Sequence, residues 1–180
     1  MDTIVAKITN DSLTDKKIYE QAGKILREGG LVAFPTETVY GLGADALDEE
    51  ASAKIYAAKG RPSDNPLIVH IADIEALYKL SCEVPDKALK LADKFWPGPL
   101  TMILKKSDIV PDSITGGLGT VAIRMPSHKV AAELIRTSGV YIAAPSANTS
   151  GKPSPTRASH VIKDLSGKID MIIEDDTVDI

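Results

Sequence analysis

Two basic residues, separated by one glycine, follow a predicted helix in the run Lys59-Gly60-Arg61-Pro62. A guanidinium binds phosphate oxygens bidentately and an ammonium acts as a point charge, so the pair could hold the phosphates of a nucleotide. Taken alone, the two charges are better explained as cations that favour the C-terminus of the helix. The run is not a Walker loop, because the chain contains no G-x-x-x-x-G-K-[ST] pattern.

A second polar run, Thr36-Glu37-Thr38-Val39-Tyr40, follows the short apolar stretch 31–34. A loop at the end of a buried strand lies at the usual ligand edge of an open α/β sheet. The next residues, 41–46, formally match the dinucleotide fingerprint G-x-G-x-x-A. We reject that match, because the true fingerprint turns tightly from strand to helix and a loop intervenes here. A strand cap explains the polar run as well as a binding site does.

Two further candidates lie inside predicted strands. Alternation places Arg124 on one face with Thr120 and Ala122, near a buried sheet, where a charge requires an anionic partner. A ligand carboxylate and an internal Asp or Glu explain that charge equally well. His70 lies inside the apolar strand predicted at 67–71, where a hydrogen-bonded core histidine is the default, although alternation with Val69 could direct it into a pocket.

The run Ala143 to Gly151 is small and polar and directly follows a predicted strand. Small side chains let a ligand approach the backbone, and Ser146 and Asn148 offer hydroxyl and amide groups. Ser146 lacks the G-x-S-x-G pattern of a hydrolase nucleophile. For the turn Trp96-Pro97-Gly98-Pro99, packing is the favoured role. The histidines and Cys82 show no metal-ligand spacing, so we predict no metal site.

These residues need elements to position them, and hydrophobic patterning predicts strands and helices that interleave. Loops are expected at 35–47 and 110–119. Because the order does not strictly alternate, we predict an α/β fold with a twisted mixed sheet, parallel and antiparallel, flanked by helices. Strands are predicted over 3–8, 31–34, 67–71, 100–104, 120–124, 140–144 and from 171; helices are predicted around 18–26, after Asp48, and over 73–80, 85–95, 129–136 and 156–163.

Composition limits the class of protein. The 180 residues, with 43% apolar residues and a net charge of −4, suffice for one domain, 1–180, with its own core. A single cysteine fits a reducing compartment. No apolar stretch approaches the roughly 18 residues of a membrane helix, and the N-terminus lacks a signal pattern, so we expect a cytoplasmic protein without membrane contact. The acidic balance and few aromatics argue against a protein that coats nucleic acid.

Five segments, in this order, resemble the YrdC-like family of threonylcarbamoyl-AMP synthases, and the resemblance covers nearly the whole chain. The joint occurrence of the five segments is far more specific than any one of them. The resemblance implies that the sheet fold described above contains a large basic cavity. The segments are Phe34-Pro35-Thr36-Glu37-Thr38-Val39-Tyr40-Gly41-Leu42, Lys59-Gly60-Arg61-Pro62 with Asn65-Pro66-Leu67, Trp96-Pro97-Gly98-Pro99-Leu100-Thr101, Arg124-Met125-Pro126 and Ala144-Pro145-Ser146-Ala147-Asn148-Thr149-Ser150-Gly151.

The resemblance implies an enzyme, a nucleotidyltransferase that joins L-threonine, bicarbonate or CO₂, and ATP into threonylcarbamoyl-AMP and pyrophosphate. A downstream threonylcarbamoyl transferase would use the product for the t6A modification of tRNA, and Mg²⁺ would arrive with ATP. The resemblance also implies site roles. Lys59 and Arg61 would hold the triphosphate and act in catalysis, with Ser63, Asn65, Ser146 and Asn148 on the nucleotide; Thr36, Tyr40, His70 and Arg124 would hold threonine.

One departure from the family concerns the C-terminus. Longer members continue past the position of Ile180 with a strand that closes over threonine and then a second domain, so the chain is either truncated or a short member. Two alternatives to the synthase remain. One is a module that binds RNA or a nucleotide without catalysis, with weak binding to tRNA or other RNA. The other is a domain that forms a carbamoyl-adenylate.

Overall fold

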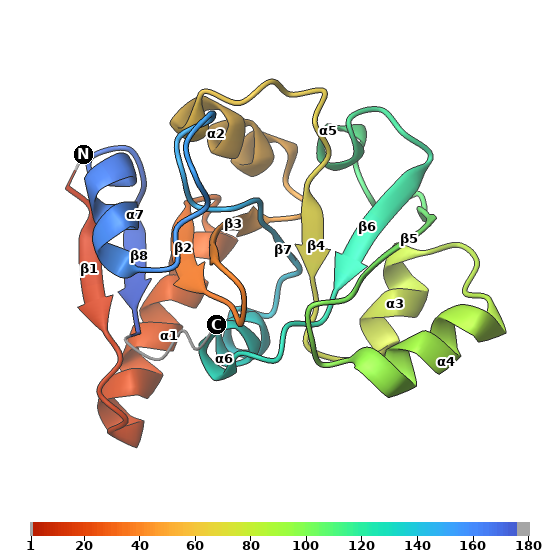
Figure 1. The fold of residues 1–180 in the computed structure, drawn as a ribbon, viewed down its shortest axis with the longest axis horizontal. Helices are drawn as coiled ribbons and strands as arrows, with labels where there is room; N and C mark the ends of the chain where they lie inside the picture. Colours follow the sequence, from red (N-terminus) through yellow and green to blue (C-terminus); the bar gives the residue numbers. More distant parts are fainter. Residues whose placement is uncertain (1, 176–180) are drawn as a thin grey trace.

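A mixed sheet of eight strands runs through residues 2–175, the part of the chain that the computed structural model describes (Figure 1). The strands lie in the order β1-β8-β2-β3-β7-β4-β6-β5. Three neighbouring pairs are parallel, β1 with β8, β8 with β2, and β4 with β6, and the other pairs are antiparallel. The predicted mixed α/β sheet flanked by helices is confirmed.

The elements follow the predicted order, with two additions in segments where only loop is expected. These are the strand β3 and the short helix α5. The strands are β1 (Ile4–Lys7), β2 (Val32–Pro35), β3 (Tyr40–Asp45), β4 (Ile68–His70), β5 (Thr101–Lys105), β6 (Thr120–Arg124), β7 (Ile142–Ala143) and β8 (Met171–Glu174). The helices are α1 (Ser12–Arg27), α2 (Glu49–Lys59), α3 (Glu75–Leu80), α4 (Asp86–Phe95), α5 (Asp112–Thr115), α6 (Lys129–Ser138) and α7 (Ala158–Leu165).

Side-chain caps start α1, α2 and α6, the last through His128 Nδ1, which accepts from the amide of Val130. The Asp48 carboxylate accepts hydrogen bonds from the amides of Glu50 and Ala51 and so starts α2, which follows Asp48 as predicted. Asp11 does the same for α1 by accepting from the amide of Thr14. Such a cap is worth about 1 kcal/mol, because it satisfies amides that have no partner inside the helix.

The prediction of a loop from 35 to 47 is wrong for β3, which pairs antiparallel with β2. The sequence does not predict β3 because Gly41 and Gly43 lie within it, and glycine weakens a strand pattern. The packing explains Gly43, since a Cβ there would lie 2.6 Å from Ile142 Cγ2 and 2.8 Å from Phe34 Cε1. Both glycines lie inside a strand, which confirms that they do not form a dinucleotide fingerprint.

The sheet separates two hydrophobic cores, and alternation along the strands decides which residue joins which. Val32 and Phe34 of β2 join the core formed with α1 and α6, whereas Ala33 between them joins the other core. That second core receives side chains from α2, α3, α4, α5 and α7. Helices α1 and α6 therefore cover one face at the β2 and β8 end of the sheet, and the remaining helices cover the opposite face.

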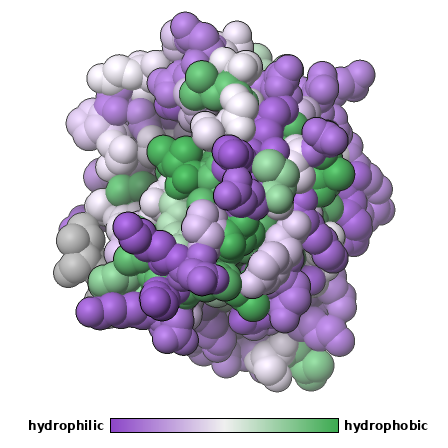
Figure 2. Space-filling model, turned by 90° about the vertical axis from the view of Figure 1, so that its right-hand side faces the viewer, coloured by the Kyte–Doolittle hydropathy of each residue, from purple (hydrophilic) through white to green (hydrophobic). Residues whose placement is uncertain are grey.

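The face that α1 and α6 cover is open at the other end of the sheet. On β6, Val121 and Ile123 join the core beneath α3 and α4, so Thr120, Ala122 and Arg124 share the opposite face, as predicted. Ile103 of β5 pairs with Ala122 and is 70% exposed. Seen from the side of β5 and α4, hydrophobic residues are exposed among hydrophilic ones (Figure 2). The large basic cavity stays a prediction.

The segment 171–176 is expected to lead toward the further strand of longer family members. Its residues 171–174 form β8, and the residues from 176 onward lie outside the described part of the chain. Within residues 2–175, no helix combines the length and the apolar character that a bilayer crossing requires.

Candidate active site

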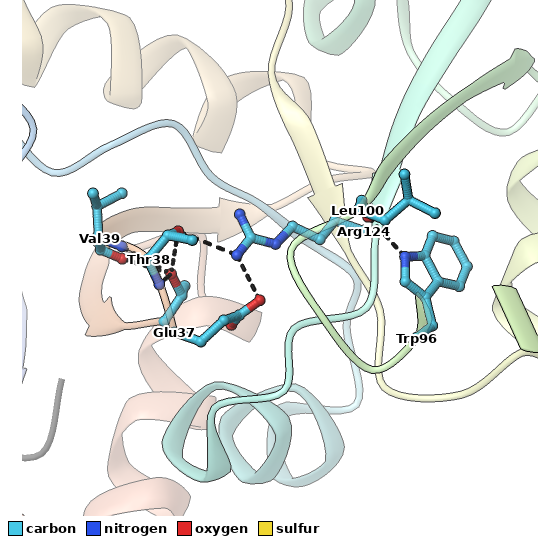
Figure 3. Close-up of polar contacts among 7 residues, drawn as sticks. Glu37, Thr38, Val39, Trp96, Leu100 and Arg124 are labelled. Atoms are coloured by element: carbon cyan, nitrogen blue, oxygen red, sulfur yellow. Dashed lines mark hydrogen bonds and ion pairs between the residues drawn. The ribbon is translucent and has the colours of Figure 1, made fainter. Parts of the chain in front are cut away.

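Arg124 ends β6 and points its guanidinium at the turn between β2 and β3 (Figure 3). Its Nη2 donates to Glu37 Oε1 over 2.6 Å and to Thr38 Oγ1 over 3.2 Å. Burial alone would raise the pKa of Glu37, but the hydrogen bond from Arg124, the backbone amides and the charge of Arg124 together outweigh it and hold that pKa below its usual value. The structure thus supplies the internal carboxylate, one of the two partners that the sequence leaves open.

The ion pair leaves hydrogen-bonding capacity on both side chains. Within residues 2–175, the buried atoms Arg124 Nε and Glu37 Oε2 have no hydrogen-bond partner. A guanidinium carries five donor hydrogens in a planar arrangement, so Arg124 can bind a second carboxylate while it holds Glu37. A ligand oxygen at Nε would relieve the free-energy cost of a buried donor without a partner.

The turn that faces Arg124 is held by its own hydrogen bonds. Thr36 Oγ1 donates to the carbonyl oxygen of Val39 over 2.7 Å, and the amides of Thr38 and Val39 lie 3.3 Å from the same Oγ1. Thr36 is buried. The turn therefore presents Glu37 and Thr38 to Arg124 in a fixed conformation, with Thr36 directly beside them.

His70 lies next to Arg124, because the two residues pair across the parallel strands β4 and β6. Its Nδ1 is 3.1 Å from the carbonyl oxygen of Ile68, and its ring meets the Phe34 ring edge-on at 6.2 Å. Burial and then the positive charge of Arg124 lower the pKa of His70 to about 4. The imidazole is therefore neutral at pH 7 and can contribute a hydrogen bond but no charge.

The turn around Trp96 packs as predicted. Trp96 joins the core beneath α3 and α4, and its Nε1 donates to the carbonyl oxygen of Leu100 over 2.7 Å (Figure 3). The amide of Gly98 donates to the carbonyl oxygen of Met125 over 2.8 Å. Because Met125 directly follows Arg124, this bond ties the turn to the end of β6.

A second polar cluster surrounds Lys59, the last residue of α2. Only 2% of the residue is exposed. Its ammonium donates to the carbonyl oxygens of Ser146 and Asn148 in the loop after β7. Burial and then the charge of Arg61 lower the pKa of Lys59 to about 8, so the ammonium keeps its proton at pH 7.

The loop after β7 is closed by side-chain hydrogen bonds. Ser146 Oγ donates to Asn148 Oδ1 over 2.5 Å, and Asn148 Nδ2 donates to the carbonyl oxygens of Thr149 and Lys152 over 2.9 and 2.8 Å. Asp164 of α7 accepts from the Thr149 amide over 3.3 Å and from Lys152 Nζ over 2.7 Å. The sequence contains no signal for this role, because Asp164 directly follows the helix predicted at 156–163 and resembles any other polar surface residue.

Tyr40 connects the two clusters through its backbone. Its carbonyl oxygen accepts from the amide of Ala147 over 2.8 Å, between Ser146 and Asn148, and its amide donates to the carbonyl oxygen of Pro155 over 2.8 Å. Its hydroxyl donates to the carbonyl oxygen of Asp175 over 3.0 Å. Tyr40 therefore fixes the turn at 36–39 relative to the loop after β7.

The structure places the predicted residues in three groups. Thr36, His70 and Arg124 form one cluster, and Lys59, Ser146 and Asn148 form the other, with Tyr40 between them. Arg61, Ser63 and Asn65 lie on the neighbouring loop 60–66, where Arg61 Nη2 donates to the carbonyl oxygen of Pro66 over 3.2 Å. Glu37 and Thr38 belong to the polar run 36–40, but the sequence pattern did not predict them as site residues.

No set of three or more His, Cys, Asp or Glu residues that could hold a metal ion comes together within residues 2–175. The two clusters instead offer a buried guanidinium, a buried ammonium, hydroxyls and amides. Such groups bind and orient anions, and they provide charge rather than a covalent nucleophile.

A mixed α/β sheet with a guanidinium cluster and an ammonium cluster joined by one tyrosine defines a class of proteins suited to anionic small molecules. Comparison with known proteins identifies the family within that class. The Sua5/YciO/YrdC family model, described as telomere recombination, matches residues 24–180. The chain belongs to this family, as its five segments predict.

The chain is similar to proteins named threonylcarbamoyl-AMP synthase. It is 59% identical to that of Pyrococcus abyssi over 96% of this chain and 50% of the relative, and 58% identical to that of Bacillus subtilis over 93% and 49%. The crystal structure of P. abyssi Sua5 complexed with L-threonine is 56% identical with a TM-score of 0.90, over 97% of this chain and 50% of that chain. The chain thus spans about half the length of these relatives.

Proposed function

We propose that this chain carries the threonylcarbamoyl-AMP synthase activity named for its relatives, with L-threonine, bicarbonate or CO₂, and ATP as substrates. The observation that carries the proposal is the Arg124 cluster. The buried Arg124 guanidinium has an unpartnered Nε and lies beside the neutral His70 imidazole and the Thr36 hydroxyl. This set of groups suits the carboxylate and polar groups of an amino acid. The names of the relatives and the threonine complex of P. abyssi Sua5 support the same assignment.

The chemistry explains why the site consists of cations and amides. The amine of threonine and CO₂ form a carbamate, one carbamate oxygen attacks the α-phosphorus of ATP, and pyrophosphate leaves. Arg124 would hold the threonine carboxylate, with Thr36 and His70 on its other polar groups. Lys59 and Arg61 would hold the phosphates. Catalysis then consists mainly of bringing two anions together and neutralising their charge, so no covalent nucleophile is required.

We assign the nucleotide to Lys59, Ser146 and Asn148 together with loop 60–66. When bound, Mg²⁺ would neutralise charge on the phosphates, and it would be carried mainly by phosphate oxygens and water. The donor set fits this arrangement, since the nucleotide side offers an ammonium and a guanidinium rather than a group of carboxylates. The chain's own residues would thus position ATP, and the phosphates of ATP would bind the metal.

The product is a reactive acyl-adenylate, so a second enzyme must use it. We propose that a threonylcarbamoyl transferase uses it in the cytoplasm for the t6A modification of tRNA, as the family resemblance implies. The chain itself would bind RNA only weakly, because its net charge is −4 and phosphate binding depends on Lys and Arg.

The decisive experiment is incubation of the chain with ATP, Mg²⁺ and bicarbonate, with and without L-threonine. Pyrophosphate release that depends on threonine, together with threonylcarbamoyl-AMP in the mass spectrum, is the expected result. Release that carbamoyl phosphate stimulates in place of threonine would favour a carbamoyl-adenylate activity. If neither substrate binds to the folded chain but RNA does, with a steep loss of affinity in salt, the synthase assignment fails.

A further inference from the structure

Loop 60–66 carries three residues assigned above to the nucleotide, so its position matters for the reaction. The loop is attached at both ends by backbone hydrogen bonds. At its start the amide of Arg61 donates to the carbonyl oxygen of Tyr56 over 3.0 Å. Directly after its end the amide of Leu67 donates to the carbonyl oxygen of Ile114 in α5 over 2.9 Å. Between these points, something else must hold the chain.

Tyr56 of α2 supplies that contact. Its hydroxyl donates to the carbonyl oxygen of Asn65 and to that of Ser113 in α5, each over 3.1 Å. A phenol has a single donor hydrogen, so the two carbonyl groups share it. The residue is only 7% exposed, and burial raises its pKa, which keeps the phenol protonated. Tyr56 therefore joins α2, the loop and α5 at one atom.

The other side of the loop rests on the end of α5. Gly116 closes this helix with φ +61°, and a Cβ there would lie 2.7 Å from the carbonyl oxygen of Asp64. Only a glycine permits this approach together with a positive φ. The loop is thus enclosed between the Tyr56 hydroxyl and the C-terminal end of α5.

We propose that Tyr56 is a positioning residue for the nucleotide, which holds loop 60–66 against α5 and so places Arg61, Ser63 and Asn65 at the phosphates. The role rests on the function proposed above, because it concerns the ATP side of that site. It acts through the loop, so the substrate itself does not touch the phenol. The threonine side depends on β6 and the turn at 36–39, which Tyr56 does not hold.

Tyr56→Phe tests the role, because it removes the shared hydrogen and keeps the ring in the core. Ser52→Ala is the matched control. Ser52 lies one turn earlier on α2, and its hydroxyl bonds to Asp48, Glu49 and Ser113 instead of the loop. For both variants, calorimetry gives the Kd for Mg²⁺-ATP, for pyrophosphate and for L-threonine. Hydrogen exchange reports the amides of Arg61, Ser63, Asp64 and Asn65.

We expect Tyr56→Phe to raise the Kd for ATP and for pyrophosphate about fivefold, the scale of one hydrogen bond, and to leave the Kd for threonine unchanged. Exchange of the loop amides should rise in Tyr56→Phe and stay at the wild-type rate in Ser52→Ala. Faster exchange with an unchanged Kd for ATP would overturn the role. So would equal losses for ATP and threonine, which indicate general destabilisation.

The exchange measurement needs no ligand, which separates this role from the proposed function. If the wild-type chain binds neither ATP nor pyrophosphate, the proposed function fails and with it the nucleotide part of the role. Exchange then still decides whether Tyr56 holds the loop, and unchanged rates in Tyr56→Phe would overturn that as well. Gly116→Ala approaches the loop from α5 and should also raise the Kd for ATP without affecting threonine.

Discussion

The ammonium of Lys59 lies 2.6 Å from the carbonyl oxygen of Asn148, and it donates to Ser146 as well. An ammonium has three donor hydrogens, so two are used inside the protein and one is left for a phosphate. Lys59 closes the loop after β7 from within, and in the function proposed above it would also offer charge to the nucleotide. One substitution would remove both roles together.

Lys59→Met removes the ammonium, and with it both roles, without disturbing helix α2. The variant keeps an unbranched stem and deletes the ammonium, so two buried carbonyl groups lose their donor at a cost of about 1–3 kcal/mol in the free energy of unfolding. We expect the Kd for ATP to rise about tenfold and the Kd for threonine to change little. Lys54→Met is the control, because Lys54 on the same helix donates to the Gly29 carbonyl, away from the site. A folded Lys59→Met that binds ATP normally would remove Lys59 from the nucleotide site.

The lowered pKa of Lys59, about 8, predicts how ATP binding depends on pH. As pH rises through that value, the ammonium loses its proton and its charge, so ATP affinity should fall between about pH 7 and about pH 9. Calorimetry at a series of pH values measures this. The fall should be absent in Lys59→Met, and an identical pH profile in the two proteins would assign the titration to another group.

Arg124→Ala should impair threonine binding far more than ATP binding. A hydrogen bond to a charged group contributes about 1.5–3 kcal/mol, which corresponds to a Kd for threonine raised about ten- to a hundredfold. Arg124→Lys keeps the charge but loses the planar set of donors, so it should recover only part of the affinity. Titration of each variant with each substrate gives the comparison. Equal losses for threonine and ATP would contradict the assignment of Arg124.

Glu37 predicts a specific loss of stability in acid. Its pKa lies below the usual 4.5, so the Arg124 pair contributes stability that is present above that pH and lost as pH falls through the lower folded value. Glu37→Gln should therefore be less stable than wild type near neutrality, and its stability should fall less below about pH 4.5. Urea unfolding at a series of pH values tests this. Glu133→Gln, which breaks an exposed pair with Arg136, should follow the wild-type profile.

The Arg124 cluster illustrates how far the sequence could predict the site. Alternation along β6 was sufficient to place Arg124 on one face with Thr120 and Ala122, because the strand period is two wherever one face is buried. Its partner could not be derived, since Glu37 is 87 residues away and any carboxylate in the chain could neutralise it. Charge predicts that a partner exists, and only the pairing of the strands decides which one.

The missed strand β3 has a different cause. Propensity arguments assume that a strand side chain contributes packing, but at Gly43 the packing comes from Phe34 and Ile142 filling the space of a side chain. Nothing local to the sequence reveals that approach. The same applies to α5, whose four residues are too few for a periodic pattern but which is held by Ile114 in the core and by contacts with the loop 60–66 and Leu67. Tertiary contacts outweigh local propensity at both places.

Asp164 is predicted to hold the loop after β7 in place. Asp164→Ala removes the acceptor of the Thr149 amide and the partner of Lys152, so the Kd for ATP should rise several-fold and the exchange of loop amides should increase. Asp164→Asn keeps a side-chain oxygen for the Thr149 amide and should lose less. The order wild type, Asn, Ala in ATP affinity is the expected result. Equal affinities in all three would show that the loop keeps its place without Asp164.

Gly43→Ala tests whether the glycines of β3 serve packing instead of phosphate binding. A methyl group there would collide with Ile142 and Phe34, and overpacking of this kind costs about 1–3 kcal/mol. Gly41→Ala is the matched control in the same strand, because its Cβ would meet Ala144 and Phe34 at an ordinary 3.4 Å. Urea unfolding should therefore show a clear loss for Gly43→Ala and a small change for Gly41→Ala. A Gly43→Ala protein of native stability that had lost only nucleotide affinity would restore the fingerprint interpretation that the strand pairing rejects.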